Sequence, residues 1–426
     1  MRVYVYTLGC RLNQCESEAI ADSFSQQGFQ IVKDYNEADL VIVNTCTVTS
    51  KSEQKARRMI RLFSKSASAI AITGCYAEVE RIEVEALSSK ASVFSLSEKA
   101  SLLELPLHMK AKLAEGMDVL NALECFKKEE KSPFSFDPSS FSYHSRAYLK
   151  IQDGCDNSCG YCRTTIARGQ SVFLDSDEVV RRALKLEREG FHEIMLTGVN
   201  LTNYNHSGGG LGPLMEKLLL ALGPDMRLRL SSMEPDCVDD RLLDAISDYR
   251  VQPHFHIPIQ SASDKVLGIV NRKYSIEHVH HIIERVRNVK DDPFIACDVI
   301  SGLPGEGEKE FLETYRFLQD VGFAAMHVFP YSPRPGTPLF KVKDRPEERV
   351  RDERAEILRK LSAKQSHEYV ARQKGKSCEI LIEKGFEGTT GNYLKARVVP
   401  KDGLCLSPGM IYKGTFSSVF PLEVSL

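Results

Sequence analysis

The first part of the chain alternates short apolar runs with amphipathic stretches. Residues 2–7, 40–44 and 69–73 are rich in β-branched and aliphatic side chains, so they predict three strands. A helix is predicted over residues 13–27, before a glycine that can end it. Apolar strands separated by helices are typical of an open parallel sheet covered on both faces. We therefore expect an N-terminal α/β domain over residues 1–125.

The middle of the chain repeats the same alternation over a longer stretch. Residues 126–144 are mainly Ser, Pro and charged residues and predict a linker. Over residues 145–370, six apolar runs separated by helical patterns predict a partial (β/α)6 barrel, with its chemistry at the carboxyl ends of the strands. These runs are residues 148–152, 193–197, 227–231, 255–259, 295–300 and 325–329.

The C-terminal part changes character again. Residues 341–374 are rich in Lys, Arg and Glu and predict one long solvated helix or a pair of helices. Short apolar segments with glycine turns follow, so residues 371–426 predict a small antiparallel β-barrel. Such barrels often bind nucleic acid, but a fold does not determine function by itself.

Composition narrows the class of protein. The 426 residues carry a net charge of −2, so any nucleic-acid binding must come from local basic patches. The longest apolar runs are far too short to cross a bilayer, and the first residues are typical of a strand rather than of a signal peptide. The 12 cysteines are scattered, which favours a reducing cytoplasm.

Three cysteines lie close together just after the first predicted barrel strand. Cys155, Cys159 and Cys162 have the spacing CxxxCxxC. Three thiolates on one loop can hold three irons of a 4Fe–4S cluster and leave the fourth iron open to a small molecule. A zinc site is the alternative, but zinc usually needs a fourth ligand nearby and prefers CxxC pairs. The spacing therefore favours a redox cluster.

Three further cysteines follow the three predicted strands of the first domain. Cys10, Cys46 and Cys75 each lie within about three residues of a strand end. Because the carboxyl ends of parallel strands share one edge, these thiols are expected to meet in space. They could form a second metal site, or they could be small buried apolar residues, as free cysteines often are.

Several motifs resemble known families. The CxxxCxxC loop on the first βα unit of a partial barrel resembles the radical S-adenosylmethionine (SAM) superfamily. The order of motifs is similar to that of the methylthiotransferase family: TLGCRLNQCESE, VNTCTVT, TGCYAE, LKIQDGCDNSCGYC, ARG, LTGVNL, LSSMEP, HIPIQSASDKVL, GLPGE and FPYSPRPGTP. The terminal barrel resembles the RNA-binding TRAM domain. GCRLN and FPYSPRPGTP look most like the branch that acts on threonylcarbamoyladenosine in tRNA.

The resemblance implies a reaction and its cofactors. Cys155, Cys159 and Cys162 would hold the radical SAM cluster, and the Cys10, Cys46 and Cys75 set would hold an auxiliary 4Fe–4S cluster. The family replaces a hydrogen on carbon 2 of the adenine by a methylthio group, next to the anticodon. An unactivated aromatic C–H offers no useful acidity, so a cofactor must supply radical chemistry. The implied partners are tRNA and an electron donor such as flavodoxin or ferredoxin, with no membrane.

Contacts to SAM are expected at the barrel mouth. Glu234 could accept hydrogen bonds from the ribose hydroxyls, and Arg168 of the ARG motif could pair with the SAM carboxylate or a tRNA phosphate. For each residue the alternative is turn chemistry or a structural hydrogen bond. The predicted cofactor-binding residues are Thr197, Gly198, Glu234, Gln260, Asp298 and Arg168.

The chain departs from the family pattern just after Cys162. The family has aliphatic residues and then a proline, whereas Arg163, Thr164, Thr165 and Ile166 stand here, with Thr165 in the place of the proline. The loss of a proline puts the stiffness of this loop, and its contacts with the substrate, in question.

Two stretches are candidates for RNA contact. A basic helix is expected just after Cys46, with Glu53 as its only acid, although an ordinary solvated face is an equal alternative. The terminal barrel offers an aromatic ring and two basic side chains. The candidate residues are Arg57, Arg58, Arg61, Tyr393, Lys395 and Arg397. Deletion from Gly375 onward is expected to weaken tRNA binding and to spare cluster assembly.

Two other functions stay open at this point. A sister branch of the family would act on isopentenyladenosine in tRNA or on an aspartate of a ribosomal protein. A more distant alternative is a non-catalytic RNA-binding protein with structural metal sites.

Overall fold

The computed structural model describes residues 1–138, 140–141, 145–401 and 403–426. The predicted linker at 126–144 therefore falls partly outside the described residues.

The chain packs as two compact units. Unit 1 comprises residues 1–143, 148–156 and 162–174, and unit 2 comprises residues 144–147, 157–161 and 175–426. The N-terminal domain thus packs with two segments from the start of the predicted barrel, and the C-terminal barrel belongs to the same unit as the remaining βα repeats.

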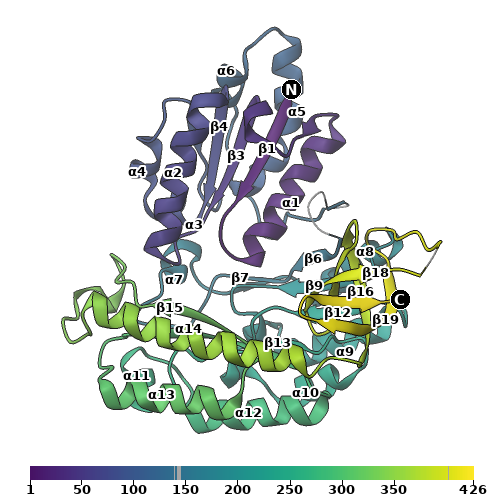
Figure 1. Ribbon diagram of the computed structural model, residues 1–426. Coiled ribbons are helices and arrows are strands. Elements are labelled where there is room, and N and C mark those ends of the chain that lie inside the picture. The colour runs from purple at the N-terminus through teal and green to yellow at the C-terminus, as the bar shows by residue number, and fades with distance from the viewer. Residues whose placement is uncertain (139, 142–144, 402) are drawn as a thin grey trace. The chain divides into compact units, whose positions relative to one another are not determined.

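Unit 1 is built on the parallel sheet that the apolar runs predict (Figure 1). Its strands are β1 (Arg2–Thr7), β2 (Gln30–Ile31), β3 (Leu40–Thr45), β4 (Ala69–Gly74) and β5 (Ala91–Val93). Their order is β2-β1-β3-β4-β5, and every pair is parallel. The three predicted strands are confirmed, and they lie side by side at the centre of the sheet.

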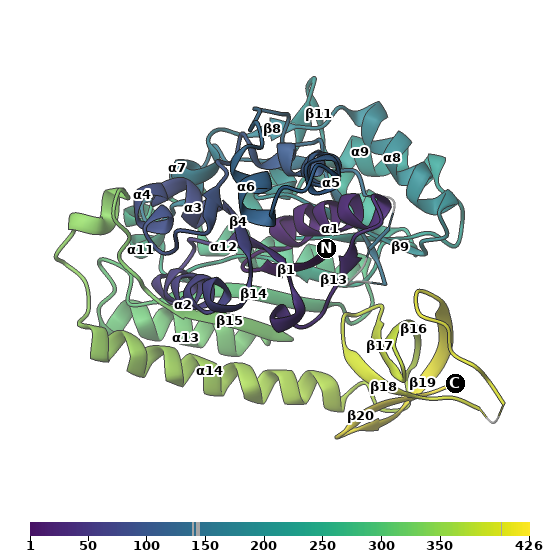
Figure 2. The ribbon, with the colours of Figure 1, turned by 90° about the horizontal axis from the view of Figure 1, so that it is seen from above.

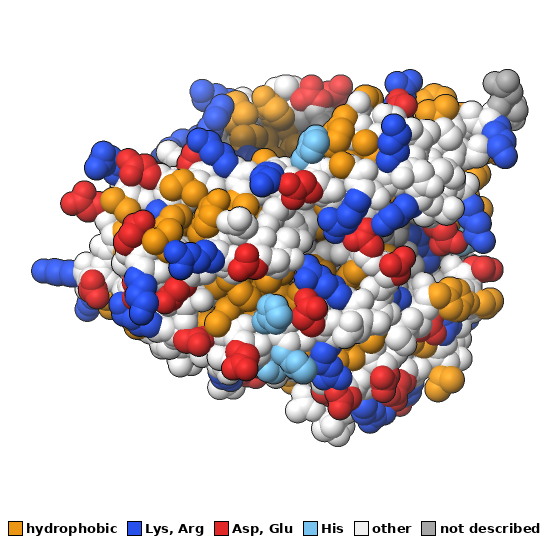
Figure 3. All heavy atoms as spheres, turned by 60° about the horizontal axis from the view of Figure 1, so that its bottom comes forward, with side chains coloured by type: hydrophobic (Ala, Val, Ile, Leu, Met, Phe, Trp, Pro, Cys, Tyr) orange, Lys and Arg blue, Asp and Glu red, His pale blue; other side chains and the backbone are white. Residues whose placement is uncertain are grey.

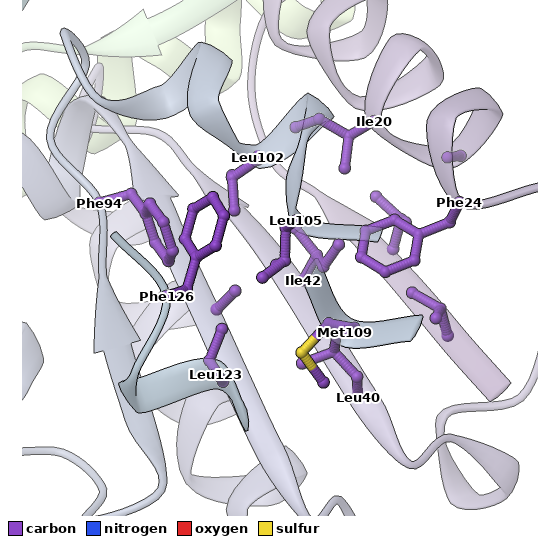
Figure 4. Close-up of a cluster of buried hydrophobic side chains, with 14 of the residues drawn as sticks. Ile20, Phe24, Leu40, Ile42, Phe94, Leu102, Leu105, Met109, Leu123 and Phe126 are labelled. Carbon is purple, nitrogen blue, oxygen red and sulfur yellow. The ribbon is translucent and has the colours of Figure 1, made fainter. Parts of the chain in front are cut away.

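Helices cover both faces of this sheet. Helices α1 (Arg11–Gln26), α5 (Leu105–Ala114) and α6 (Val119–Glu124) bury one face, and α2 (Ser50–Ser66) packs on the other. Figure 4 shows the first of these cores, where the rings of Phe94 and Phe126 lie 6.1 Å apart. Each such buried side chain contributes about 1.5–3 kcal/mol, so both layers hold the sheet in place.

The rest of unit 1 consists of short elements. They are η1 (Tyr35–Glu37), α3 (Cys75–Val79), α4 (Arg81–Glu85), η2 (Lys99–Leu103), β6 (Ala147–Lys150), β7 (Gln152–Asp153), α7 (Thr164–Arg168) and β8 (Val172–Phe173). Strands β7 and β8 pair in antiparallel fashion and flank the CxxxCxxC segment in the chain.

Unit 2 contains the remaining βα repeats of the partial barrel. Strands β9 (Glu193–Thr197) and β12 (Arg227–Leu230) are parallel, as are β13 (His254–His256), β14 (Phe294–Ser301) and β15 (Ala325–Pro330). The helices between them are α8 (Ser176–Arg188), α9 (Leu211–Ala221), α10 (Asp240–Ser247), α11 (Asp264–Ile269), α12 (Ile276–Val289) and α13 (Glu308–Val321).

Short elements lie between these repeats. They are η3 (Leu201–Asn203), β10 (Asn205–His206), β11 (Gly209–Gly210), η4 (Pro235–Cys237) and η5 (Pro338–Lys341). The fourth barrel strand ends at His256, earlier than its apolar run predicts, although the N–H groups of Ile257 and Ile259 still donate to carbonyls of β14.

One long helix, α14 (Glu348–Ala371), leads to the C-terminal barrel (Figure 2). The barrel closes in the order β16-β17-β18-β20-β19. Its strands are β16 (Ser377–Lys384), β17 (Glu387–Thr390), β18 (Lys395–Val399), β19 (Ile411–Val419) and β20 (Leu422–Ser425). The expectation of a purely antiparallel barrel is wrong at one pair. Strands β18 and β20 are parallel, because β19 lies between them in the chain and runs back along the barrel.

The barrel shares a hydrophobic core with the βα repeats of unit 2. Phe294 and Tyr369 lie in one cluster with Ile380, Val398 and Phe416 of the barrel. Figure 3 shows one face of the molecule, on which acidic and basic side chains are interspersed. No helix in the described ranges is both long and apolar enough to cross a membrane.

Candidate cluster and cofactor sites

The cysteines that follow the first three predicted strands lie at one edge of the unit 1 sheet. Cys10 comes three residues after β1, while Cys46 and Cys75 come directly after β3 and β4. Because β1, β3 and β4 are neighbours and parallel, their carboxyl ends bring the three thiols to the same edge. The structure thus places these cysteines together, as the strand pattern predicts.

A glycine lets two of these thiols approach each other. Gly9 has a φ of +96°, and a Cβ built there would lie 2.7 Å from the sulfur of Cys46. Any other residue would clash with that sulfur and would strain the backbone. The loop that carries Cys10 can therefore lie against Cys46 only with glycine at this position.

Two asparagines fasten the loops that carry these cysteines. The Asn13 side chain donates to the carbonyls of Leu8 (2.8 Å) and Thr45 (3.1 Å). Asn44 in turn donates to the Asn13 carbonyl at 3.0 Å. The sequence motif GCRLN includes Asn13, but its role as a tie between the two loops was not predicted.

The protonation of Cys46 fits a metal site. Burial, together with the nearby sulfurs of Cys10 and Cys75, raises the pKa of the Cys46 thiol to about 12. Such a thiol stays neutral at physiological pH unless a cation supplies the compensating charge. Three thiols at one sheet edge fit a 4Fe–4S cluster that keeps one iron free of protein ligands.

Arg168, on α7, lies in the same part of unit 1. Its Nη1 donates to both carboxylate oxygens of Asp153 (2.8 and 2.9 Å), and its Nη2 donates to Asn13 Oδ1 (2.8 Å). Its Nε donates to the sulfur of Cys75 at 3.3 Å. The side chain is only 3% exposed. In this structure protein groups accept from the donors of Arg168, and its pairing with SAM or with a tRNA phosphate stays a prediction.

A buried carboxylate organises the surrounding charges. Glu16 on α1 is 1% exposed and pairs with Lys99, with Lys150 Nζ (2.8 Å) and with Arg168 Nη1 (3.2 Å). Burial raises the pKa of Glu16, but these three cations outweigh it and hold the pKa well below its usual value. The sequence signal for this network was the presence of charged residues inside apolar elements, such as Lys150 in β6.

The CxxxCxxC segment is held by its own backbone bonds. In unit 1, the Cys155 N–H donates to the Gly169 carbonyl (3.1 Å), and the Thr164 N–H donates to the Cys162 sulfur (3.3 Å). Cys159 belongs to unit 2. Three thiols of one short segment, with main-chain N–H support for a sulfur, fit the ligand set of a 4Fe–4S cluster.

The departure after Cys162 has a structural explanation. Thr165, in the place of the family's proline, donates its hydroxyl to the Cys155 carbonyl at 3.3 Å. The Arg163 guanidinium is buried and pairs with Glu53 (3.0 Å) and Glu80 (2.6 Å). A hydrogen bond and two ion pairs thus hold this loop at the place where the family has a proline.

Two of the predicted SAM contacts are engaged by neighbours within unit 2. Both carboxylate oxygens of Glu234 accept from Arg272 Nη1, at 3.0 and 2.9 Å, and burial raises the pKa of this carboxyl. Asp298 lies 3.0 Å from Nε2 of His256. His256, Asp298 and His327 come from neighbouring strands, and their ligand atoms lie within 4.8 Å of one another.

The other predicted SAM contacts lie at strand ends. Thr197 ends β9, and its buried hydroxyl has no hydrogen-bond partner among the residues that the structure describes. Gly198 follows it directly. Gln260 is buried and has a φ of +64°, which is rare for a residue other than glycine. Such strained positions often occur at binding sites.

Some of the residues predicted to contact RNA are exposed, whereas others contact neighbouring protein side chains. Arg57 contacts the Tyr76 hydroxyl (3.1 Å) and Glu83 (3.3 Å), whereas Arg58 and Arg61 are exposed on α2. The Tyr393 ring lies 4.2 Å from the His254 ring and under two arginines of unit 2, so it helps to join the barrel to the βα repeats. Lys395 and Arg397 are exposed on β18.

Comparisons with known proteins agree with this organisation. Residues 2–95 match the model described as uncharacterized protein family UPF0004, and residues 149–318 match the radical SAM superfamily. The chain resembles the radical SAM methyltransferase TsrM from Kitasatospora setae in fold, with a TM-score of 0.57 and 13% identity over 80% of this chain and 74% of that one.

Two relatives match nearly the whole chain. Both are named threonylcarbamoyladenosine tRNA methylthiotransferase MtaB. The relative from Treponema pallidum (strain Nichols) is 34% identical and covers 96% of this chain and 96% of its own length. The relative from Aquifex aeolicus (strain VF5) is 34% identical over 92% of this chain and 96% of its own length. Radical SAM membership implies a 4Fe–4S cluster and SAM. The chain therefore belongs to the threonylcarbamoyladenosine tRNA methylthiotransferase family of radical SAM enzymes.

Proposed function

We propose that the protein replaces the hydrogen on carbon 2 of threonylcarbamoyladenosine in tRNA by a methylthio group. The observation that carries this proposal is the second set of three thiols, Cys10, Cys46 and Cys75, at the edge of the unit 1 sheet. A radical SAM enzyme that only abstracts hydrogen needs one cluster, whereas insertion of sulfur also needs a place to hold the sulfur. The family of the chain supports the same reaction.

The two cysteine sets take different roles in this proposal. Cys155, Cys159 and Cys162 hold the radical SAM cluster, and the sheet-edge cysteines hold the auxiliary cluster. When bound, these groups supply the one-electron chemistry that an unactivated aromatic C–H requires, and they supply the sulfur. The chain contributes the ligating thiols, the loop ties at Gly9 and Asn13, and the exclusion of water around Cys46, which is 4% exposed.

The residues proposed to contact SAM lie within or shortly after the strands of unit 2. Thr197 and Gly198 offer a hydroxyl and backbone groups after β9, and Gln260 offers a side-chain amide. Glu234 and Asp298 would present oxygens held in place by Arg272 and by a histidine. An electron donor such as flavodoxin or ferredoxin completes the proposal, and a tRNA substrate places the reaction in the cytoplasm.

Nucleoside analysis tests the reaction directly. In cells that lack this protein, mass spectrometry of digested tRNA is expected to show loss of 2-methylthio-threonylcarbamoyladenosine and accumulation of threonylcarbamoyladenosine. The wild-type gene should restore the modification, and a Cys155→Ala gene should not. Loss of a methylthio isopentenyl nucleoside, or of a methylthio aspartate in a ribosomal protein, would instead assign the chain to a sister branch.

The surface proposed for tRNA is a basic stripe on α2. Five exposed cations recur at intervals of three or four residues, which places them along one helix face. They are Lys51, Lys55, Arg58, Arg61 and Lys65. The acid within the same helix, Glu53, is buried and paired with Arg163, so it does not offset the charge of the stripe. A continuous row of cations suits a phosphate backbone.

Reversal of charge on this stripe tests the tRNA contact. Arg58→Glu with Arg61→Glu is expected to weaken tRNA binding at least about tenfold and to reduce the salt slope of log K by about 2. Fluorescence anisotropy over a salt series measures both quantities. Lys110→Glu with Lys112→Glu, on α5 at the opposite face of the sheet, provides the same charge change and should leave both values intact. An equal loss in both double variants would show a general charge effect instead.

A further inference from the structure

One arginine of unit 1 has an unusual set of partners. Arg168 donates its Nε–H to the sulfur of Cys75 at 3.3 Å. It lies at the end of α7, only six residues after Cys162 in the chain. Arg168, which contacts Cys75 of the sheet-edge cysteines, is therefore carried by the short helix that follows the CxxxCxxC segment.

Two other residues, Asp153 and Asn13, fix the orientation of the Arg168 guanidinium. Asp153 accepts from Nη1 with both oxygens (2.8 and 2.9 Å), and Asn13 Oδ1 accepts from Nη2 (2.8 Å). Because the guanidinium is planar and its five N–H groups have fixed directions, these bonds leave Nε aimed at the sulfur. Asn13 is also the residue that ties the loops of Cys10 and Cys46.

The anchors of Arg168 are themselves anchored. Asp153 also pairs with Lys150 (2.6 Å), and Lys150 pairs with Glu16 (2.8 Å). All of these side chains are buried. Ion pairs that only stabilised the fold would need no contact with a cysteine sulfur, yet the Nε–H of Arg168 donates to Cys75.

We propose that Arg168 is a positioning residue for the auxiliary cluster: its Nε–H holds the Cys75 thiolate and raises the reduction potential of that cluster. The inference rests on the proposed function, which places the cluster on Cys75. Reduction adds negative charge to an iron–sulfur cluster, and a hydrogen-bond donor with a positive charge stabilises the reduced form more than the oxidised form. Low solvent exposure strengthens this interaction.

The test uses the full-length chain with Cys155, Cys159 and Cys162 changed to alanine, so that only the auxiliary cluster can assemble. After anaerobic reconstitution, iron content and a redox titration followed by electron paramagnetic resonance are measured. In this background Arg168→Lys keeps a positive charge, but its single ammonium cannot reach Asp153, Asn13 and Cys75 together. At a fixed solution potential, the ratio of reduced to oxidised cluster is expected to fall about fivefold.

Two further variants separate this role from a structural one. Arg163→Lys disrupts the other buried arginine of the same loop, which pairs with Glu53 and Glu80, and it should leave the potential unchanged. Asp153→Glu keeps both charges but displaces the guanidinium from its anchored position, so it should shift the potential in the same direction as Arg168→Lys by a smaller amount. Asp153→Glu also provides the measurement if the Arg168→Lys chain fails to fold.

The outcomes are distinct. A shift with Arg168→Lys and Asp153→Glu but not with Arg163→Lys supports the proposal. A cluster that loads normally but keeps its potential in both Arg168→Lys and Asp153→Glu overturns it and leaves the proposed function standing. An equal shift with Arg163→Lys also overturns it. Absence of iron from the parent triple-alanine chain overturns the auxiliary cluster and this inference together.

Discussion

Alanine at Cys46 is expected to abolish methylthiolation while the chain still cleaves SAM to 5′-deoxyadenosine. Cys46 directly follows the central strand β3 at the edge proposed for the auxiliary cluster, and its side chain is almost fully buried. Alanine fits the same apolar surroundings, so the sheet should persist without one cluster ligand. We expect the thiomethyl product to fall at least about a hundredfold. The CxxxCxxC segment keeps its own bonds in this variant.

The measurement is an anaerobic assay in which 5′-deoxyadenosine and the modified nucleoside are quantified together. Cys155→Ala should lose both products, since it removes a ligand of the radical SAM cluster. Cys15→Ala is the matched control, because Cys15 is buried inside α1, donates to the Tyr148 carbonyl at 3.6 Å and does not follow a strand. It should retain both products. Full methylthiolation by Cys46→Ala would remove Cys46 from the cluster.

The sheet-edge site shows how far the sequence could predict a functional centre. The strand pattern and the rule that parallel strands end at one edge were sufficient to bring Cys10, Cys46 and Cys75 together. Both are local signals combined with a general property of the fold. The same rule excludes Cys15, because it lies inside α1 and not after a strand.

The surroundings of this centre could not be predicted in the same way. Arg168 lies 15 residues from Asp153 and 152 from Glu16 along the chain, so no local pattern shows that they meet. The ARG motif favours a contact with a ligand, whereas in the structure the Arg168 side chain donates to buried carboxylates and to a cysteine sulfur. Motifs identify residue types, but the pairing of buried charges depends on tertiary packing.

The C-terminal barrel also combines features that local patterns predict with contacts that depend on tertiary packing. Most of its short strands could be predicted from apolar runs between glycines, but β17 (Glu387–Thr390) has only small and polar residues and gives no such signal. Tyr393 was expected to contact RNA because it is aromatic and lies near two cations. In the structure its ring packs on His254 of the βα repeats. The two residues are far apart along the chain, so no local pattern predicts this contact.

Deletion from Gly375 onward is expected to destabilise unit 2, which differs from the simple loss of an RNA-binding module that the sequence suggested. The barrel covers Phe294 and Tyr369 in a shared core. Each large apolar side chain that becomes exposed costs about 1.5–3 kcal/mol. The deletion also removes the Gly391 carbonyl that accepts from the fully buried Arg229 (2.9 Å) and the Glu383 carboxylate that pairs with Arg146. Buried donors left without a partner cost about 1–3 kcal/mol each.

These losses should lower the thermal midpoint of unfolding by at least about 10 °C, measured by scanning calorimetry or circular dichroism. Reduced iron loading should accompany the change, because Cys159 belongs to the weakened unit. The control is Lys395→Ala with Arg397→Ala, two exposed cations on β18, which should leave the midpoint unchanged and lower tRNA affinity. A truncated chain that unfolds at the wild-type temperature would show that the barrel is an independent module and that its shared core contributes little to the stability of the βα repeats.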